Sequence, residues 1–330
     1  MSQDAPPGRI RRGWRPDVLP GYEARDLPLD AEPLPGEPAE PLVATLVRRR
    51  GGRRRQRAVL YVHGWNDYFF QTHLADVWHR LGFAFYAVDL RRYGRSLRCG
   101  QLFGFVADLS EYAAELDAAA AWIRAEHDEL VVMGHSTGGL VVSLWASERP
   151  GLVSGVVLNS PWLDLQGSPL LRAVGAPMIA RLANRRPTTA LRLPDVGLYA
   201  RSLHVSHQGE WDYDLDWKSS PTHPIRVGWL RAILHGHHRV AAGLGIDVPI
   251  LVMASSRSDF GRRWHEGLQA ADVVLDVEQI SRRAGLLGSC VTLQREEGGL
   301  HDLVLSAPAV RQKVFDDLAR WVRGYLLPIP

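Results

Sequence analysis

Apolar residues gather in short continuous runs along this chain, and longer segments with apolar residues at helical spacing lie between them. The runs occupy residues 58–62, 83–89, 130–133, 155–159, 249–254 and 291–294. Strands that are covered on both faces of a sheet have this composition. The helical segments occupy residues 108–124, 139–146, 225–244 and 309–325. This alternation predicts an α/β fold, with a mostly parallel central sheet and helices on both of its faces.

The N-terminal region follows a different pattern. Residues 1–40 contain eight prolines, at positions 6, 7, 16, 20, 28, 33, 35 and 38. They predict a partly extended arm with one edge strand near residues 22–29. Residues 41–47 favour a further strand. The basic run at 48–57 has two glycines at its centre, so it indicates a turn that joins residues 41–47 and 58–62 as a hairpin.

The chain divides by pattern into an arm, a core and an insertion. Residues 1–40 form the arm, and residues 41–160 and 249–330 are predicted to form the core. The segment between them, 161–248, is long and irregular, and it contains several prolines. Insertions of this size between core strands are usually functional. We therefore interpret residues 161–248 as a cap over the carboxyl ends of the strands, where parallel sheets bind ligands.

The sequence around Ser136 carries the strongest chemical signal. An apolar run at 130–133 ends in Gly134-His135-Ser136-Thr137-Gly138, and a helical pattern follows. This order of strand, sharp turn and helix is the context of a G-x-S-x-G nucleophile elbow. Gly134 and Gly138 fit such a turn because a Cβ atom at either position would clash. The pattern predicts that Ser136 is a nucleophile.

A serine nucleophile needs a histidine base and a carboxylate that orients it, and in this fold they follow in the order serine, acid, histidine. His301 lies just past a late strand between flexible glycine-rich residues, so it is the predicted base. The acid is chosen from the loop after residues 249–254. Asp272, which precedes an apolar pair, is preferred over Asp259. Asp276 is expected to cap the helix that starts next to it.

Backbone N–H groups are expected to stabilise the oxyanion. Thr137 follows the nucleophile at a helix N-terminus, so its N–H is one predicted donor. The second should come from the loop after residues 58–62, where Trp65 is the first choice and Asn66 the next.

Together these motifs resemble the α/β-hydrolase superfamily, and within it the lysophospholipase and monoacylglycerol-lipase-like serine hydrolases. The resemblance spans about residues 40–326. It rests on five motifs in the expected order, namely His63-Gly64, residues 89–96, residues 134–138, Asp272 to Asp276, and Gly299-Leu300-His301. It implies hydrolysis of a small-molecule ester through an acyl-enzyme, with no metal and no organic cofactor. The insertion is then expected to line an apolar acyl pocket.

The same site is compatible with other reactions. Peptidases, thioesterases, acyltransferases and cofactor-free haloperoxidases share the fold and the catalytic residues, and sequence does not separate them. A non-catalytic ligand-binding protein is a further alternative. The oligomeric state stays open.

Composition narrows the partners. The chain has 330 residues, 46% of them hydrophobic, and a net charge of +3. Lysine occurs only at positions 218 and 313, and the arginines do not form one basic face with interleaved aromatic residues, so no nucleic-acid partner is expected. Contact of the run at 48–57 with anionic lipid headgroups is the minority interpretation.

Neither a secretory signal nor a membrane span is recognised, so a soluble cytoplasmic protein is expected. Two distant cysteines, Cys99 and Cys290, indicate no disulfide framework. Five histidines of the insertion, at positions 204, 207, 235, 237 and 238, match no common zinc spacing.

Overall fold

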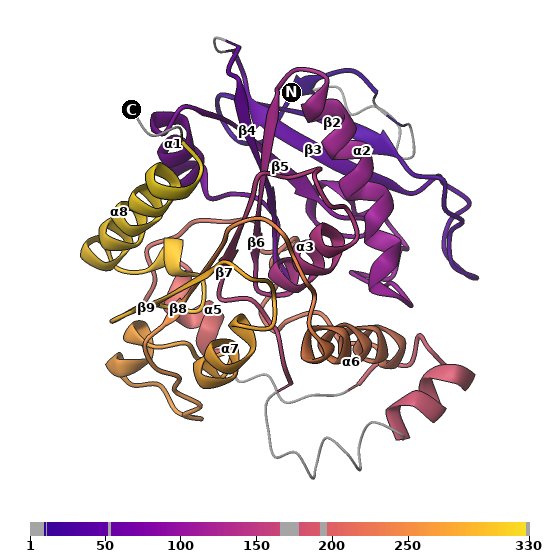
Figure 1. Cartoon of the computed structure of the whole chain (residues 1–330). Helices are drawn as coiled ribbons and strands as arrows, with labels where there is room; N and C mark the ends of the chain where they lie inside the picture. Colours follow the sequence, from indigo (N-terminus) through magenta and orange to yellow (C-terminus); the bar gives the residue numbers. More distant parts are fainter. Residues whose placement is uncertain (1–9, 11, 52–53, 166–177, 192–196, 328–330) are drawn as a thin grey trace.

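The computed structural model describes residues 10, 12–51, 54–165, 178–191 and 197–327. A nine-stranded sheet lies at its centre. The parallel part of the sheet has the order β5 (Phe83–Asp89), β4 (Arg57–Val62), β6 (Glu129–His135), β7 (Gly155–Asn159), β8 (Ile250–Ser255) and β9 (Val291–Glu296). The carboxyl ends of these strands therefore meet at one edge of the sheet. The expected α/β architecture is confirmed (Figure 1).

Three N-terminal strands extend the sheet in antiparallel fashion. They are β1 (Arg15–Pro16), β2 (Tyr22–Pro28) and β3 (Val43–Arg49). The predicted hairpin between residues 41–47 and 58–62 is wrong, because β3 pairs with β5, which lies between β3 and β4. The glycines of the basic run indicated that the chain turns, but they did not indicate which strand pairs with β3. β4 is buried on both faces and takes a parallel partner on each side, which leaves no edge for β3.

Helices cover both faces of the sheet (Figure 1). On one face, α1 (Thr72–Arg80) and α8 (Pro308–Tyr325) pack against residues such as Val59 and Tyr61. On the other face lie α2 (Ala113–Arg124), α3 (Thr137–Ser147) and α7 (Val277–Ala284). Short 3₁₀ turns lie at η1 (Gly94–Ser96), η2 (Leu109–Tyr112), η3 (Glu266–Ala270) and η4 (Leu303–Leu305).

The helix expected over residues 108–124 begins as a 3₁₀ turn, η2, before α2 continues it. Asp108 accepts a hydrogen bond from the Ser110 N–H, and the Glu111 side chain accepts from the Asp108 N–H. These two bonds form a capping box.

The segment after β5 carries three buried arginines, each paired with an acid. The side chain of Arg91 bonds Glu115, and that of Arg92 bonds Glu37 of the N-terminal region. Arg95 contacts both Asp89 of β5 and Asp17 of the N-terminal region. Since a buried guanidinium needs its counter-ion, the pairs Arg92–Glu37 and Arg95–Asp17 attach the N-terminal region to the core.

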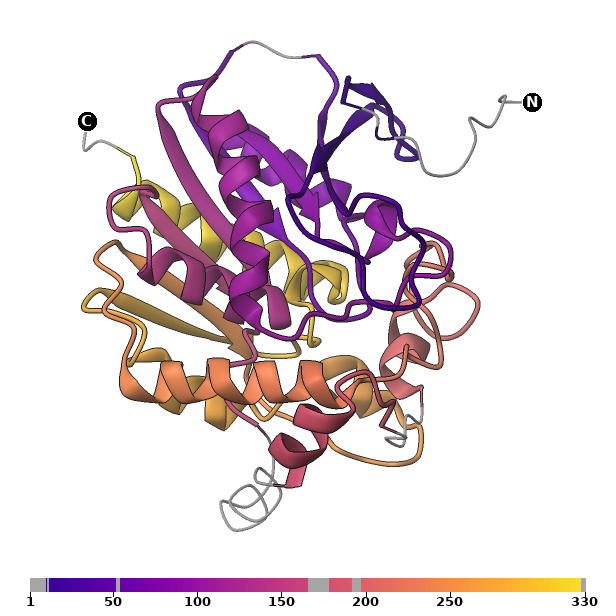
Figure 2. The same ribbon diagram turned by 90° about the vertical axis from the view of Figure 1, so that its right-hand side faces the viewer.

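Residues 161–248 lie between β7 and β8 and contain α5 (Leu198–Leu203) and α6 (Val227–Ala242). Residues 166–177 and 192–196 of the insertion, and residues 1–9 and 11 of the arm, lie outside the described part of the chain. In Figure 2, α6 runs across the lower end of the core. A Cβ atom on Gly236 of α6 would lie 2.9 Å from Leu109 and 3.2 Å from Leu140, so the helix packs closely on α3 and η2.

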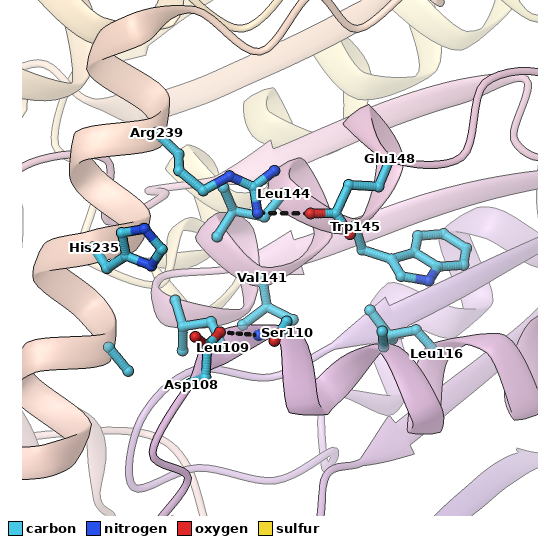
Figure 3. A pocket seen from close by; sticks show the side chains of 13 residues that line it. Asp108, Leu109, Ser110, Leu116, Val141, Leu144, Trp145, Glu148, His235 and Arg239 are labelled. Carbon is cyan, nitrogen blue, oxygen red and sulfur yellow. Dashed lines mark hydrogen bonds and ion pairs between the residues drawn. The ribbon is translucent and has the colours of Figure 1, made fainter.

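Charged side chains reinforce this contact at its rim. Figure 3 shows Arg239 of α6 reaching Glu148 at the end of α3, with a 2.6 Å separation between their charged groups. The hollow between these elements measures about 20 Å³, which is too small for an organic substrate. Any substrate cavity therefore lies elsewhere. Within the described residues, no helix combines the length and the apolar character needed to cross a lipid bilayer.

Candidate active site

A single residue separates the central strand from the helix that follows it. β6 ends at His135 and α3 begins at Thr137, so Ser136 forms the turn. Its backbone has φ of +53° and ψ of −118°, a region that L-residues rarely occupy. A Cβ atom on Gly134 would lie 2.5 Å from the carbonyl oxygen of Gly138, which explains why a glycine is needed here.

Three residues from distant parts of the chain form a continuous hydrogen-bonded chain. The Oγ atom of Ser136 lies 3.0 Å from Nε2 of His301, and Nδ1 of His301 lies 2.9 Å from Oδ2 of Asp272. All three residues are buried. A carboxylate can only accept, so Nδ1 carries the proton. The lone pair of Nε2 then faces the serine hydroxyl.

Asp272 is held firmly for this contact. Its Oδ1 atom accepts hydrogen bonds from the N–H groups of Val274 (2.8 Å) and Leu275 (2.7 Å). These bonds leave Oδ2 directed at His301. The apolar pair that favoured Asp272 in the sequence includes one of these donors.

The two alternative acids, Asp259 and Asp276, have other partners. Asp259 turns its carboxylate toward Arg257 (3.4 Å) and His265 (3.5 Å), and not toward His301. Asp276 accepts from the Glu278 N–H and caps α7, as expected. The long loop nevertheless brings Asp259 back beside the site, because its N–H donates to the Asp272 carbonyl oxygen at 2.9 Å.

The loop after β4 lies directly against Ser136. A Cβ atom on Gly64 would lie 3.0 Å from Cβ of Ser136. Among the described residues, the N–H groups of Trp65 and Thr137 donate no hydrogen bond. The first residues of a helix have free N–H groups and carry its positive dipole end. Thr137 is such a residue, so an anion beside Ser136 would meet a free donor at the start of α3.

A cavity of about 220 Å³ opens at Ser136 and His301. The core contributes Trp65 and Asn66 to its wall, and the insertion contributes Tyr199, Tyr213, Lys218 and Ser219. The wall is mostly apolar, and Lys218 adds a charged group to it. The sequence showed the tryptophans and leucines of the insertion, but not that a lysine would turn inward.

Trp65 fixes one side of this cavity through aromatic contacts. Its ring centroid lies 4.2 Å from that of Trp229 on α6, and Trp162 lies 6.0 Å from Trp229 on the other side. Phe103 packs edge-on against Trp65 at 5.6 Å. The insertion and the core thus share an indole cluster beside Ser136.

A cluster of buried polar groups lies beside Ser136 and His301. Ligand-type atoms of Asp67, His135 and Asp302 lie within 4.8 Å of one another, and in the described residues they are the one group that could hold a metal ion. Their surroundings already supply positive and donor groups. Nζ of Lys218 lies 2.9 Å from Oδ1 of Asp67, and the Asn159 amide donates to Asp302 at 2.6 Å. We propose no metal here.

Two members of this cluster, His135 and Asp302, have pKa values that burial and nearby charges shift. Burial lowers the pKa of His135, and the nearby Asp302 opposes this only in part. Burial alone would raise the pKa of Asp302, but His135, the Asn159 donor and Lys218 together hold that pKa below its usual value. Asp302 therefore stays ionised and His135 stays neutral near neutral pH.

The inward position of Lys218 and its pairing with Asp67 were missed by sequence reasoning. The one available signal was the scarcity of lysine, and it does not reveal burial. His135 is buried, its Nδ1 contacts the Asn159 carbonyl oxygen at 3.2 Å, and its side chain also lines the cavity.

Two known proteins of similar sequence are a monoacylglycerol lipase and a phospholipase. The chain is 31% identical over 163 residues to the monoacylglycerol lipase of Mycolicibacterium smegmatis. The matched region covers 46% of this chain and 57% of that protein. It is 30% identical over 110 residues to phospholipase YtpA of Bacillus subtilis, covering 33% of this chain and 41% of that protein. The matches thus span about half of each relative's length.

Solved structures share the fold at lower identity. The monoacylglycerol lipase of Paleococcus ferrophilus matches with a TM-score of 0.60 at 19% identity, over 83% of this chain and 96% of that one. A soluble variant of monoglyceride lipase from Saccharomyces cerevisiae matches with a TM-score of 0.63 at 14% identity, over 99% and 98% of the two chains.

A family model supports the same relationship over more than half of the chain. The model described as serine aminopeptidase, S33, matches residues 53–261, which include the turn at Ser136 and the loop after β4. The fold, the relatives and this match agree, and the chain belongs to the Hydrolase_4 family (serine aminopeptidase, S33) of α/β-hydrolases.

Proposed function

We propose that this protein is a serine hydrolase that cleaves carboxylic esters through an acyl-enzyme on Ser136. The observation that carries the proposal is the hydrogen-bonded chain from Ser136 through His301 to Asp272, with separations of 3.0 and 2.9 Å. A serine hydroxyl becomes nucleophilic when a base accepts its proton, and the base works when a third group fixes its tautomer. The contacts of His301 with Ser136 and Asp272 support both conditions.

The first half of the reaction forms the acyl-enzyme. Nε2 of His301 accepts the Ser136 proton while Oγ bonds to the ester carbonyl carbon, and the carbonyl oxygen becomes an oxyanion. Asp272 stabilises the imidazolium that results. His301 then returns the proton to the leaving alkoxide, the carbon–oxygen bond breaks, and the alcohol leaves.

The second half regenerates the enzyme. His301 accepts a proton from a water molecule, the hydroxide attacks the acyl carbon, and the second tetrahedral intermediate forms. The proton then returns from His301 to Oγ of Ser136, and the carboxylic acid is released. The free N–H of Thr137 and the N–H of Trp65 are proposed as the donors that stabilise the oxyanion in both halves.

The choice of an ester rests on the relatives and on the cavity. The curated relatives are a monoacylglycerol lipase and a phospholipase. The cavity of about 220 Å³ suits a small-molecule ester better than a folded partner. We further propose that residues 161–248 act as a cap that encloses this substrate, because the insertion supplies Tyr199, Tyr213 and Lys218 to the wall.

Labelling with a fluorophosphonate probe tests the nucleophile. We expect modification of Ser136 alone, with loss of labelling in Ser136→Ala and a large decrease in His301→Ala. Hydrolysis of p-nitrophenyl esters should disappear in the same variants. Undiminished labelling of Ser136→Ala would refute the assignment.

A peptidase is the second candidate, because the matching family model is described as a serine aminopeptidase. The same residues can attack an amide. Comparison of amino-acid p-nitroanilides with p-nitrophenyl esters separates the two functions. A higher kcat/KM for the anilides would favour the peptidase, although amides are intrinsically less reactive.

A further inference from the structure

The loop that carries the proposed oxyanion donor Trp65 is held from the side of the insertion. Three consecutive residues after Trp65 are each bonded to one short segment of the insertion, residues 214–223, about 150 positions later. We propose that Lys218 and Ser219 are positioning residues for this loop. This inference rests on the proposed function.

Asn66 makes the first of these connections. Its φ of +52° is left-handed, a conformation that asparagine tolerates better than most residues. The Asn66 Nδ2 group donates to the Ser219 carbonyl oxygen at 2.9 Å, and the Ser219 hydroxyl donates to Asn66 Oδ1 at 3.1 Å. The N–H of His223 adds a long contact to the same oxygen at 3.4 Å. The insertion therefore holds the residue directly after the proposed donor.

Asp67 makes the second connection, which is an ion pair with Lys218. Asp67 is 1% exposed and Lys218 is 7% exposed, so their pair at 2.9 Å is shielded from water. The second oxygen of Asp67 has no hydrogen-bond partner among the described residues. Without Lys218, this carboxylate would be buried with no counter-ion beside it, and the loop would move to hydrate it.

Tyr68 makes the third connection, since the Asp214 N–H donates to its hydroxyl at 2.8 Å. On the other side, the loop is fixed by the core, where Gly64 lies against Ser136. Trp65 therefore lies between Gly64, which contacts the core, and residues 66–68, which contact the insertion. An oxyanion donor acts only when its N–H is placed to within a fraction of an ångström, so loss of the insertion contacts should reduce turnover more than substrate binding.

Lys218 also lines the cavity, so a direct contact with substrate is the competing explanation. Its ammonium group lies 5.6 Å from the ring of Tyr199 and 5.7 Å from that of Tyr213, and it donates a hydrogen bond to Asp67. A residue that binds substrate changes KM. A residue that positions an oxyanion donor changes kcat and leaves KM nearly constant.

The experiment uses the full chain and an ester that the wild type hydrolyses. We expect Lys218→Met to lower kcat roughly 10- to 100-fold, with KM within about threefold of the wild-type value. The double variant Asp67→Asn/Lys218→Met should recover part of kcat because it leaves no unpaired charge. The matched control is Lys313→Met on α8, whose partners are Glu296 and Asp317 and which should keep full activity.

A transition-state analogue provides the readout that a purely structural role would not change. An alkyl trifluoromethyl ketone forms a hemiketal oxyanion with a serine, so its affinity should fall in Lys218→Met by about the same factor as kcat/KM. Near-UV circular dichroism checks the fold. If Lys218→Met does not fold, Asn66→Gly retains the left-handed backbone and loses its side-chain contacts with the insertion, and the same loss of kcat is expected.

The inference is overturned if kcat of these variants stays within about twofold of wild type, if KM alone changes, or if kcat falls while ketone affinity is unchanged. In those cases the proposed function stands, because the wild type still hydrolyses the ester. A wild type that hydrolyses no ester and leaves Ser136 unlabelled refutes both.

Discussion

Replacement of Asp272 by asparagine tests the proposed mechanism at the point where geometry makes the clearest demand. Oδ1 of Asp272 accepts two backbone N–H groups, at 2.8 and 2.7 Å, and Oδ2 accepts from His301. An asparagine keeps the two backbone bonds only if its carbonyl oxygen takes the place of Oδ1. Its NH₂ group must then face Nδ1 of His301.

The consequence is a change of tautomer. Two donors cannot face each other, so Nδ1 loses its proton and Nε2 gains it. Nε2 then has no lone pair for the proton of Ser136. From other serine hydrolases we expect kcat to fall on the order of 10³- to 10⁴-fold, which corresponds to about 4–5.5 kcal/mol of transition-state stabilisation. Thermal stability should change little, because the side chain keeps its shape.

Steady-state hydrolysis of a p-nitrophenyl ester and the rate of fluorophosphonate labelling measure the effect, and both should fall together. Asp259→Asn is the matched control, because its carboxylate contacts Arg257 and His265 instead of His301. It should retain turnover within about twofold. If Asp259→Asn is the inactive variant and Asp272→Asn is active, the reasoning from the hydrogen bond to His301 is wrong.

Three further outcomes are expected. Along p-nitrophenyl esters from acetate to octanoate, kcat/KM should rise by at most about fourfold per CH₂, from ~0.8 kcal/mol of burial each, and a flat series would show that the cavity takes no acyl chain. Glu37→Ala leaves the buried Arg92 without its carboxylate, so urea unfolding should show that the free energy of unfolding falls by about 3–5 kcal/mol. A decrease of less than about 1 kcal/mol would contradict the conclusion that this pair attaches the arm to the core. Burial lowers the pKa of His135 below its ordinary 6.5, so the unfolded chain binds more protons, and stability should fall as pH drops below that value, by at most ~1.4 kcal/mol per pH unit. His135→Asn should flatten the curve of unfolding free energy against pH, and an unchanged slope would exclude His135 as its source.

Much of the fold follows from the runs of apolar residues, because strands buried on both faces have no polar alternation. Strand pairing did not follow so directly. β3 and β4 are consecutive in the chain, yet β5 lies between them. Helix α1 was not among the predicted helical segments, since its apolar face is confined to Leu74, Ala75, Val77 and Trp78. Local pattern indicates which segments are buried, and the pairing depends on contacts that are distant in sequence.

The candidate site shows the same division. Ser136 could be predicted as the nucleophile because the turn imposes glycines at fixed spacing, and His301 as the base because it follows the last strand. The preference for Asp272 over Asp259 rested on an apolar pair, and Asp272 is the acid that lies 2.9 Å from His301. Lys218 and Asp67 could not be paired from sequence, because they are separated by 151 positions and no local pattern connects a lysine to a distant acid.

The indole cluster formed by Trp65, Trp162 and Trp229 has a spectroscopic consequence. Indoles whose centroids lie 4.2 and 6.0 Å apart, tilted by 46° and 39°, couple electronically and produce a paired positive and negative circular dichroism band. Trp65 lies on the loop beside Ser136, whereas Trp229 lies on α6. Any separation of α6 from that loop would therefore remove the contribution of the Trp65–Trp229 pair to the band. The protein contains its own optical reporter of how the insertion sits on the core, and no added dye is needed to follow it in solution.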